Sequence, residues 1–125
     1  MRIEEEALAA HPRECCGLIE GVREGEIVIA LAVHQAANLA ARADRFEIDP
    51  AAQFALLRSL RGTGRKIVGC YHSHPDGRAE PSARDAEGAS EPGFVWLIAG
   101  GDGAMAAFVF HCGAFDPLAL AERAP

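Results

Sequence analysis

The chain has 125 residues, of which 50% are hydrophobic and 24% charged, and its formal net charge is -6. Such a composition excludes fibrous and disordered proteins, and the length suits one domain over residues 1–125 that buries about two-thirds of its unfolded surface. Because the chain is acidic and has no basic cluster, we expect no nucleic-acid partner. The longest apolar run, residues 27–33, is too short to cross a bilayer, and no signal-peptide pattern opens the chain. We therefore expect no membrane partner and a cytoplasmic location.

The first half of the chain predicts one helix followed by strands. Residues 2–11 begin with acidic side chains, which favour the first turn of a helix. Residues 15–20 predict the first strand, ended by Gly21. Residues 26–34 predict a second strand, and its continuous apolar run indicates burial on both faces or nearly so. The alanine-rich segment 35–44 has no clear period, and residues 45–48 predict a short strand.

The second half predicts alternating helices and strands. Asp49 and Pro50 are typical of a helix start, and an apolar stripe follows before the closing glycines of residues 62–64. Residues 66–74 predict a strand, 82–89 a short helix, 94–99 and 104–111 a hairpin, and 113–120 an edge strand. Together these elements predict an α/β protein with a mixed β-sheet flanked by helices on both sides. The stripe consists of Phe54, Leu56, Leu57 and Leu60.

The strand at residues 66–74 ends in a histidine pair. His72 and His74 are two residues apart, so their side chains share one face of the strand about 7 Å apart. Pro75 cannot continue a central ladder, which leaves both imidazoles at the strand end. Asp85 falls in the first turn of the next predicted helix and could turn its carboxylate back toward them. Two nitrogens, one oxygen and an open fourth position are typical of catalytic zinc, so the sequence predicts Zn²⁺ held by His72, His74 and Asp85.

Each of these residues also has an interpretation that needs no metal. Ser82 and Asp85 fit a helix N-cap with an acidic residue at the third helical position. The histidine pair could form a polar strand end, and Glu14 could be a surface carboxylate. The combined spacing favours the metal site over these separate explanations.

The four cysteines, Cys15, Cys16, Cys70 and Cys112, include no Cys-x-x-Cys pair. In a cytosolic protein they predict neither a disulfide framework nor a thiolate zinc site. We expect them to act as small hydrophobic side chains. Strand alternation leaves open whether Cys16 or Cys70 touches the metal site, and a cysteine protease built on Cys15 or Cys16 also stays open.

The run His72-Ser73-His74-Pro75, followed by Ser82 and Asp85, resembles the zinc signature of the JAMM/MPN+ metalloprotease family, and the chain is similar in size to its small stand-alone prokaryotic members. The segment Glu14-Cys15-Cys16-Gly17-Leu18 is similar to the family's upstream glutamate element. The resemblance implies a fold related to that of cytidine deaminases. It also implies that Glu14 transfers the proton of the attacking water and that Ser82 donates a hydrogen bond to the oxyanion.

The same resemblance implies a protein substrate. Family members hydrolyse an amide bond after the C-terminal Gly-Gly of a ubiquitin-like protein, and small bacterial members act on a ubiquitin-like sulfur-carrier protein. The chain is close to the minimal domain, which favours the sulfur-carrier type. The alternative is a catalytically inert zinc-binding MPN module that serves as a protein-interaction scaffold. The sequence does not predict the carrier, the leaving amino acid or the oligomeric state.

Overall fold

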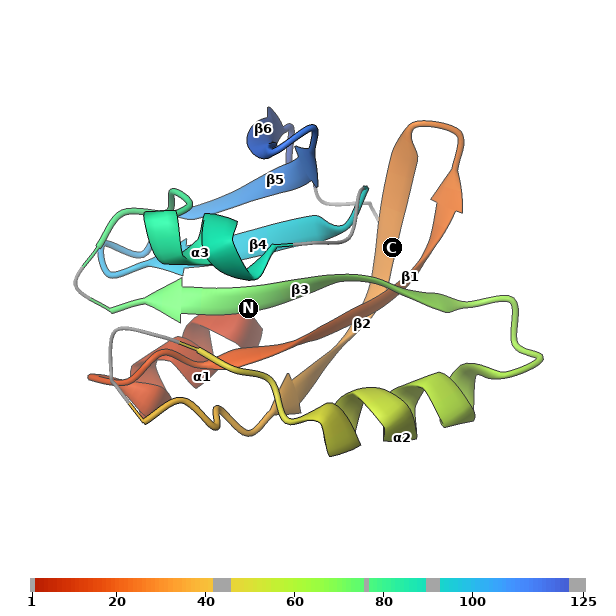
Figure 1. Cartoon of the computed structure of the whole chain (residues 1–125), viewed down its shortest axis with the longest axis horizontal. Helices are drawn as coiled ribbons and strands as arrows, with labels where there is room; N and C mark the ends of the chain where they lie inside the picture. The colour runs from red at the N-terminus through yellow and green to blue at the C-terminus, as the bar shows by residue number, and fades with distance from the viewer. Residues whose placement is uncertain (1, 42–45, 76, 90–92, 122–125) are drawn as a thin grey trace.

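One mixed sheet of six strands forms the centre of the protein (Figure 1). The computed structural model describes residues 2–41, 46–75, 77–89 and 93–121. The strand order is β2-β1-β3-β4-β5-β6, with β3 and β4 parallel and the other neighbours antiparallel. The elements are α1 (Arg2–Ala10), β1 (Cys16–Glu24), β2 (Ile27–Ala36), α2 (Pro50–Leu60), β3 (Lys66–His74), α3 (Ala83–Gly88), β4 (Val95–Gly100), β5 (Met105–His111) and β6 (Ala114–Leu118).

Helices lie on both faces of this sheet. Helix α1 adds Ile3 to the main core, where it packs with Tyr71 of β3 and Leu97 of β4. On the opposite face, α3 brings Asp85 to His72. The predicted fold class, a mixed sheet with helices on both sides, is therefore confirmed. Among the described residues, no helix is long and apolar enough to span a bilayer.

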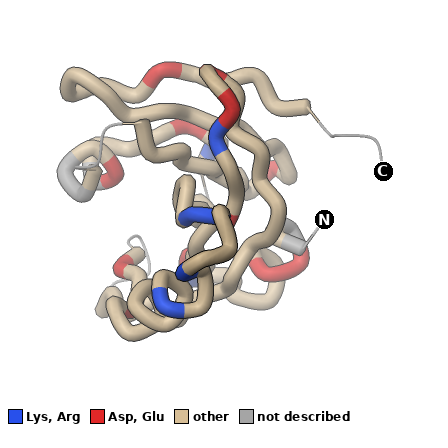
Figure 2. The backbone as a smooth tube through the Cα atoms, turned by 90° about the vertical axis from the view of Figure 1, so that its right-hand side faces the viewer, with Lys and Arg blue, Asp and Glu red and all other residues tan. Residues whose placement is uncertain are grey.

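Charged residues are distributed over several elements. Figure 2 shows the Lys and Arg positions as several separate segments of the backbone, one of which directly adjoins an acidic segment. This distribution agrees with the scattered positions of the basic residues in the sequence.

Strand β1 is longer than the sequence predicts. It continues through Gly21 to Glu24, with an irregularity in its pairing between Glu20 and Gly21. A Cβ atom at Gly21 would lie 2.1 Å from the carbonyl oxygen of Ile29, so only glycine permits this approach of the two backbones. The prediction that Gly21 ends the strand was wrong, because the glycine marks a bulge instead.

Strand β2 is an edge strand, and the prediction that it is buried on both faces was wrong. It pairs with β1 alone, and the side chains of Ile27 and Leu31 are 64% and 46% exposed. A continuous apolar run is typical of a central strand, but the run does not specify how many neighbours the strand has.

The segment before α2 also differs from the prediction of a short strand. Ile48 forms an isolated bridge with Asn38, while Arg45 of that predicted strand lies outside the described residues. Asp49 caps α2 as predicted, since its carboxylate accepts a hydrogen bond from the Ala51 amide at 2.9 Å. Of the predicted apolar stripe, only Leu56 is buried.

The remaining elements follow the predictions closely. Strand β3 has the predicted bounds and ends at His74, immediately before Pro75. The hairpin of β4 and β5 and the edge strand β6 are also present. The turn between β4 and β5 closes with a hydrogen bond of 2.8 Å from the Gly100 amide to the Ala104 carbonyl.

Candidate metal centre

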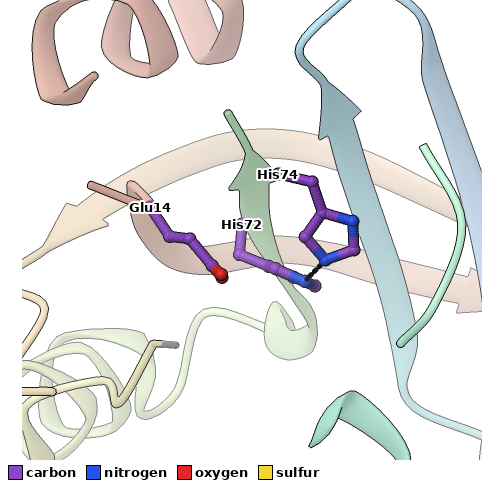
Figure 3. A group of neighbouring side chains, drawn as sticks. All are labelled: Glu14, His72 and His74. Atoms are coloured by element: carbon purple, nitrogen blue, oxygen red, sulfur yellow. Dashed lines mark hydrogen bonds between the residues drawn. The ribbon is translucent and has the colours of Figure 1, made fainter. Parts of the chain in front are cut away.

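The end of β3 presents two imidazoles on one face (Figure 3). His72 is fully buried, and its Nε2 lies 2.9 Å from Nε2 of His74. The other ring nitrogen of His74, Nδ1, lies 2.9 Å from the carbonyl oxygen of Arg78. A carbonyl can only accept, so Nδ1 carries the proton and Nε2 of the neutral ring presents its lone pair to the site.

Helix α3 supplies a carboxylate to the same point. Ser82 is its N-cap: its Oγ accepts from the Asp85 amide at 3.1 Å, and its own amide donates to Oδ2 of Asp85 at 2.8 Å. Held in this way, the carboxylate lies 3.1 Å from Nε2 of His72 and 3.2 Å from Nε2 of His74. The Ser82-x-x-Asp85 pattern therefore caps the helix and also directs Asp85 toward the histidines. Ser82 itself is exposed.

Glu14 reaches the histidine pair from the start of β1. It is buried, and one of its carboxylate oxygens lies within 4.8 Å of a ring nitrogen of both His72 and His74 (Figure 3). Its place just before β1 explains this, because Cys16 pairs directly with His72 and Glu14 precedes Cys16 by two residues. The structure thus brings Glu14, His72, His74 and Asp85 together from three distant parts of the chain.

The electrostatics of the site follow from burial and from the carboxylate. Burial lowers the pKa of His72. Burial also acts to lower the pKa of His74, but the hydrogen bonds with Asp85 and with the Arg78 carbonyl outweigh it, and the net shift is upward. For Asp85, burial acts to raise the pKa, but the two imidazoles outweigh it and hold the pKa well below its usual range. Asp85 is therefore ionised at neutral pH.

These donors fit a small divalent cation. Two imidazole lone pairs 2.9 Å apart repel each other unless a proton or a cation lies between them. Zinc bonds of about 2.0–2.1 Å in a tetrahedron place ligand atoms about 3.3 Å apart, close to the separations of 2.9–3.2 Å found here. One carboxylate and two imidazoles are also the donor types that zinc prefers.

Two aromatic side chains that sequence reasoning missed fix the ring of His72. Phe46 stacks on it with centroids 4.2 Å apart, and Trp96 meets its edge at 5.8 Å. The buried Nδ1 of His72 has no hydrogen-bond partner among the described residues, so packing orients this ring. The sequence predicts Phe46 as part of a short strand, and no local pattern indicates its stacking on His72.

The cysteines do not form part of the cluster. The group of possible ligand atoms among the described residues contains no sulfur. Burial raises the pKa of Cys15 and that of Cys16, the latter to about 12. A nucleophilic cysteine needs a lowered pKa, so this environment disfavours a cysteine protease.

Comparison with known proteins decides the family. The family model described as prokaryotic homologs of the JAB domain matches residues 2–111. The chain belongs to this family. A protein named desampylase from Haloferax volcanii is 37% identical over 118 residues, covering 94% of this chain and 84% of the relative. A probable TtuB-protein conjugate cleaving protease from Thermus thermophilus is 38% identical over 95 residues, covering 76% of this chain and 61% of the relative.

Solved structures share the fold of this chain. The solution structure of DSY2949 from Desulfitobacterium hafniense matches with a TM-score of 0.84 and 29% identity, over 94% of this chain and 83% of that one. AF2198 from Archaeoglobus fulgidus, a JAB1/MPN domain protein, matches with a TM-score of 0.63 and 18% identity, over 95% and 88% of the two chains. The second likeness shows that the JAB chain has the fold of a JAB1/MPN domain.

Proposed function

We propose that this JAB protein is a zinc-dependent hydrolase that cleaves the amide bond after the C-terminal Gly-Gly of a ubiquitin-like or sulfur-carrier protein. The convergence of Glu14 and Asp85 on the two histidines carries the proposal. The relatives support a hydrolase of protein conjugates, since one is named a desampylase and another a conjugate cleaving protease.

His72, His74 and Asp85 are the residues that would hold the ion. The two imidazole Nε2 atoms lie 2.9 Å apart, and Asp85 places Oδ1 3.1 Å from that of His72 and Oδ2 3.2 Å from that of His74. The ionised Asp85 offsets part of the charge of a divalent cation. Zinc, when bound, lowers the pKa of water to about 7 and polarises a carbonyl group.

We assign ligation to Asp85 and proton transfer to Glu14. The Asp85 carboxylate contacts both imidazole nitrogens at 3.1 Å and 3.2 Å, and one oxygen of Glu14 lies within 4.8 Å of both, near enough to exchange a proton with a water in the site. Glu14 takes a proton from the water whose oxygen adds to the carbonyl carbon. It then delivers that proton to the amide nitrogen as the C–N bond breaks. The hydroxyl hydrogen of Ser82 is left to donate to the developing oxyanion, since Ser82 Oγ accepts from Asp85.

The substrate proposal predicts metal-dependent release of an amino acid from a carrier. A ubiquitin-like sulfur-carrier protein extended beyond Gly-Gly by one cysteine, incubated with the zinc-loaded protein, should lose the mass of that cysteine. Intact-mass spectrometry follows the reaction. A chelator should stop it, and added zinc should restore it.

Two outcomes would contradict this proposal. If a panel of Gly-Gly-X carriers stays uncut while an unrelated peptide is hydrolysed, the substrate class is wrong. If the zinc-loaded protein binds such a carrier without cleaving it, the chain is an inert MPN scaffold.

A further inference from the structure

The candidate base Glu14 lies outside the β ladder. The first paired residue of β1 is Cys16, which faces His72, and neither Glu14 nor Cys15 belongs to the strand. Ladder hydrogen bonds therefore do not fix the peptide group that joins Glu14 to Cys15. A catalytic carboxylate needs a defined position, so another contact has to hold this backbone.

Two side chains bind the two polar groups of that peptide. The carbonyl oxygen of Glu14 accepts a hydrogen bond from Nδ2 of Asn38 at 2.9 Å. The amide of Cys15 donates to Oγ of Ser73 at 2.8 Å, and this contact is buried. We propose that Asn38 and Ser73 are positioning residues that clamp the Glu14–Cys15 peptide and so set the place of the Glu14 carboxylate relative to the histidines.

Ser73 links the position of the Glu14 carboxylate to that of the two histidines. Ser73 lies between His72 and His74, and its side chain points away from them. Besides the contact through Oγ, its amide donates to the carbonyl oxygen of Cys15 at 3.1 Å. The residue that separates the two imidazoles in the sequence thus also fixes the backbone next to Glu14.

The side-chain amide of Asn38 is oriented by the hydrogen bonds that its oxygen accepts. Oδ1 of Asn38 accepts from the amides of Ala40 and Glu47, at 3.0 Å and 2.9 Å. An amide carries its acceptor and its donor on opposite branches, so these two contacts leave Nδ2 as the group that faces Glu14. The contact with the Glu47 amide also fixes the backbone next to Phe46, which stacks on His72.

Small changes at Asn38 and Ser73 can separate an effect on positioning from an effect on folding. This inference rests on the proposed function, with Glu14 as the proton carrier. Asn38→Asp keeps an acceptor for Ala40 and Glu47 but replaces the donor to Glu14 with an oxygen. Ser73→Ala removes the acceptor for Cys15, and Ser73→Thr keeps it. Because a displacement of 1 Å can cost about 100-fold in rate, we expect Asn38→Asp and Ser73→Ala to lower kcat about 10–100-fold with little change in KM.

The kinetic test uses the carrier ending in Gly-Gly-Cys and the zinc-loaded protein. Zinc content should stay at one per chain in all variants, and Ser73→Thr should recover most of the activity lost in Ser73→Ala. In a Glu14→Gln background, Asn38→Asp should cause no further loss, because both changes act through the same carboxylate. The proposal would be overturned if Asn38→Asp lowered kcat as much in the Glu14→Gln background as in the unmodified protein. It would also be overturned if the Asn38 and Ser73 substitutions changed KM and left kcat unchanged.

A second readout needs neither metal nor substrate. In the metal-free protein, hydrogen exchange followed by NMR should show the Cys15 amide protected, and at least about 10-fold faster exchange in Ser73→Ala, with α2 unchanged. If the Cys15 amide exchanged at the same rate in the unmodified protein and in Ser73→Ala, the proposed clamp would be refuted. If exchange behaves as expected while no carrier is cleaved by the unmodified protein, the clamp stands and the proposed function fails.

Discussion

Glu14→Gln should retain one zinc per chain and lower kcat by about 10²–10⁴-fold, the usual contribution of a positioned proton carrier. Glutamine has nearly the shape of glutamate, so the buried position can stay filled. It cannot accept a proton from water at neutral pH. Single-turnover cleavage of the carrier, together with metal analysis of the same sample, measures both quantities.

Glu20→Gln is the matched control for this change. Glu20 lies on β1, the strand that Glu14 precedes, and is also buried, but its carboxylate bonds to Arg65 at 2.7 Å and to His34 at 2.8 Å. We expect this variant to unfold more easily and to keep its kcat. Loss of zinc from Glu14→Gln, or undiminished turnover by that variant, would rule out the role assigned to Glu14.

The second large effect is expected at a ligand. His74→Ala removes one of three donors and should weaken zinc binding by at least about 100-fold, since loss of even an outer-shell partner costs 10–100-fold. His74 is the last residue of β3 and its side chain keeps some exposure to solvent, so the fold should survive the change. Competition with a chromophoric chelator gives the affinity.

His111→Ala serves as the control for His74→Ala. His111 also ends a strand, β5, and it pairs with Asp116 at the surface. We expect its removal to leave zinc affinity unchanged. Equal zinc affinities in His74→Ala and His111→Ala would show that the metal binds elsewhere.

Local chemistry made several elements predictable. Asp49 and Pro50 define the start of α2, and Pro75 ends β3, because each acts on its own neighbours. Whether a strand lies at the edge of the sheet, and where it has a bulge, depends instead on residues far away in the sequence. The apolar run of β2 is the same whether one strand or two lie beside it, and Gly21 marks a close approach to Ile29 rather than a strand end.

The candidate site likewise has residues that the sequence predicted and residues that it did not. Strand and helix periods predicted that His72, His74 and Asp85 face one another, and the structure places them so. Asn38 and Phe46 were missed, since their contacts with Glu14 and His72 join residues 24 or more positions apart and no spacing rule connects them.

The identity of the third ligand tests the central claim most directly. Anomalous diffraction at the zinc absorption edge, on crystals of the zinc-loaded protein, locates the ion and its ligands. We predict one zinc bonded to Nε2 of His72, Nε2 of His74 and an oxygen of Asp85, with Glu14 near the ion but not bonded to it. A zinc bonded to Glu14 with Asp85 turned away, or an ion remote from both histidines, would contradict the account.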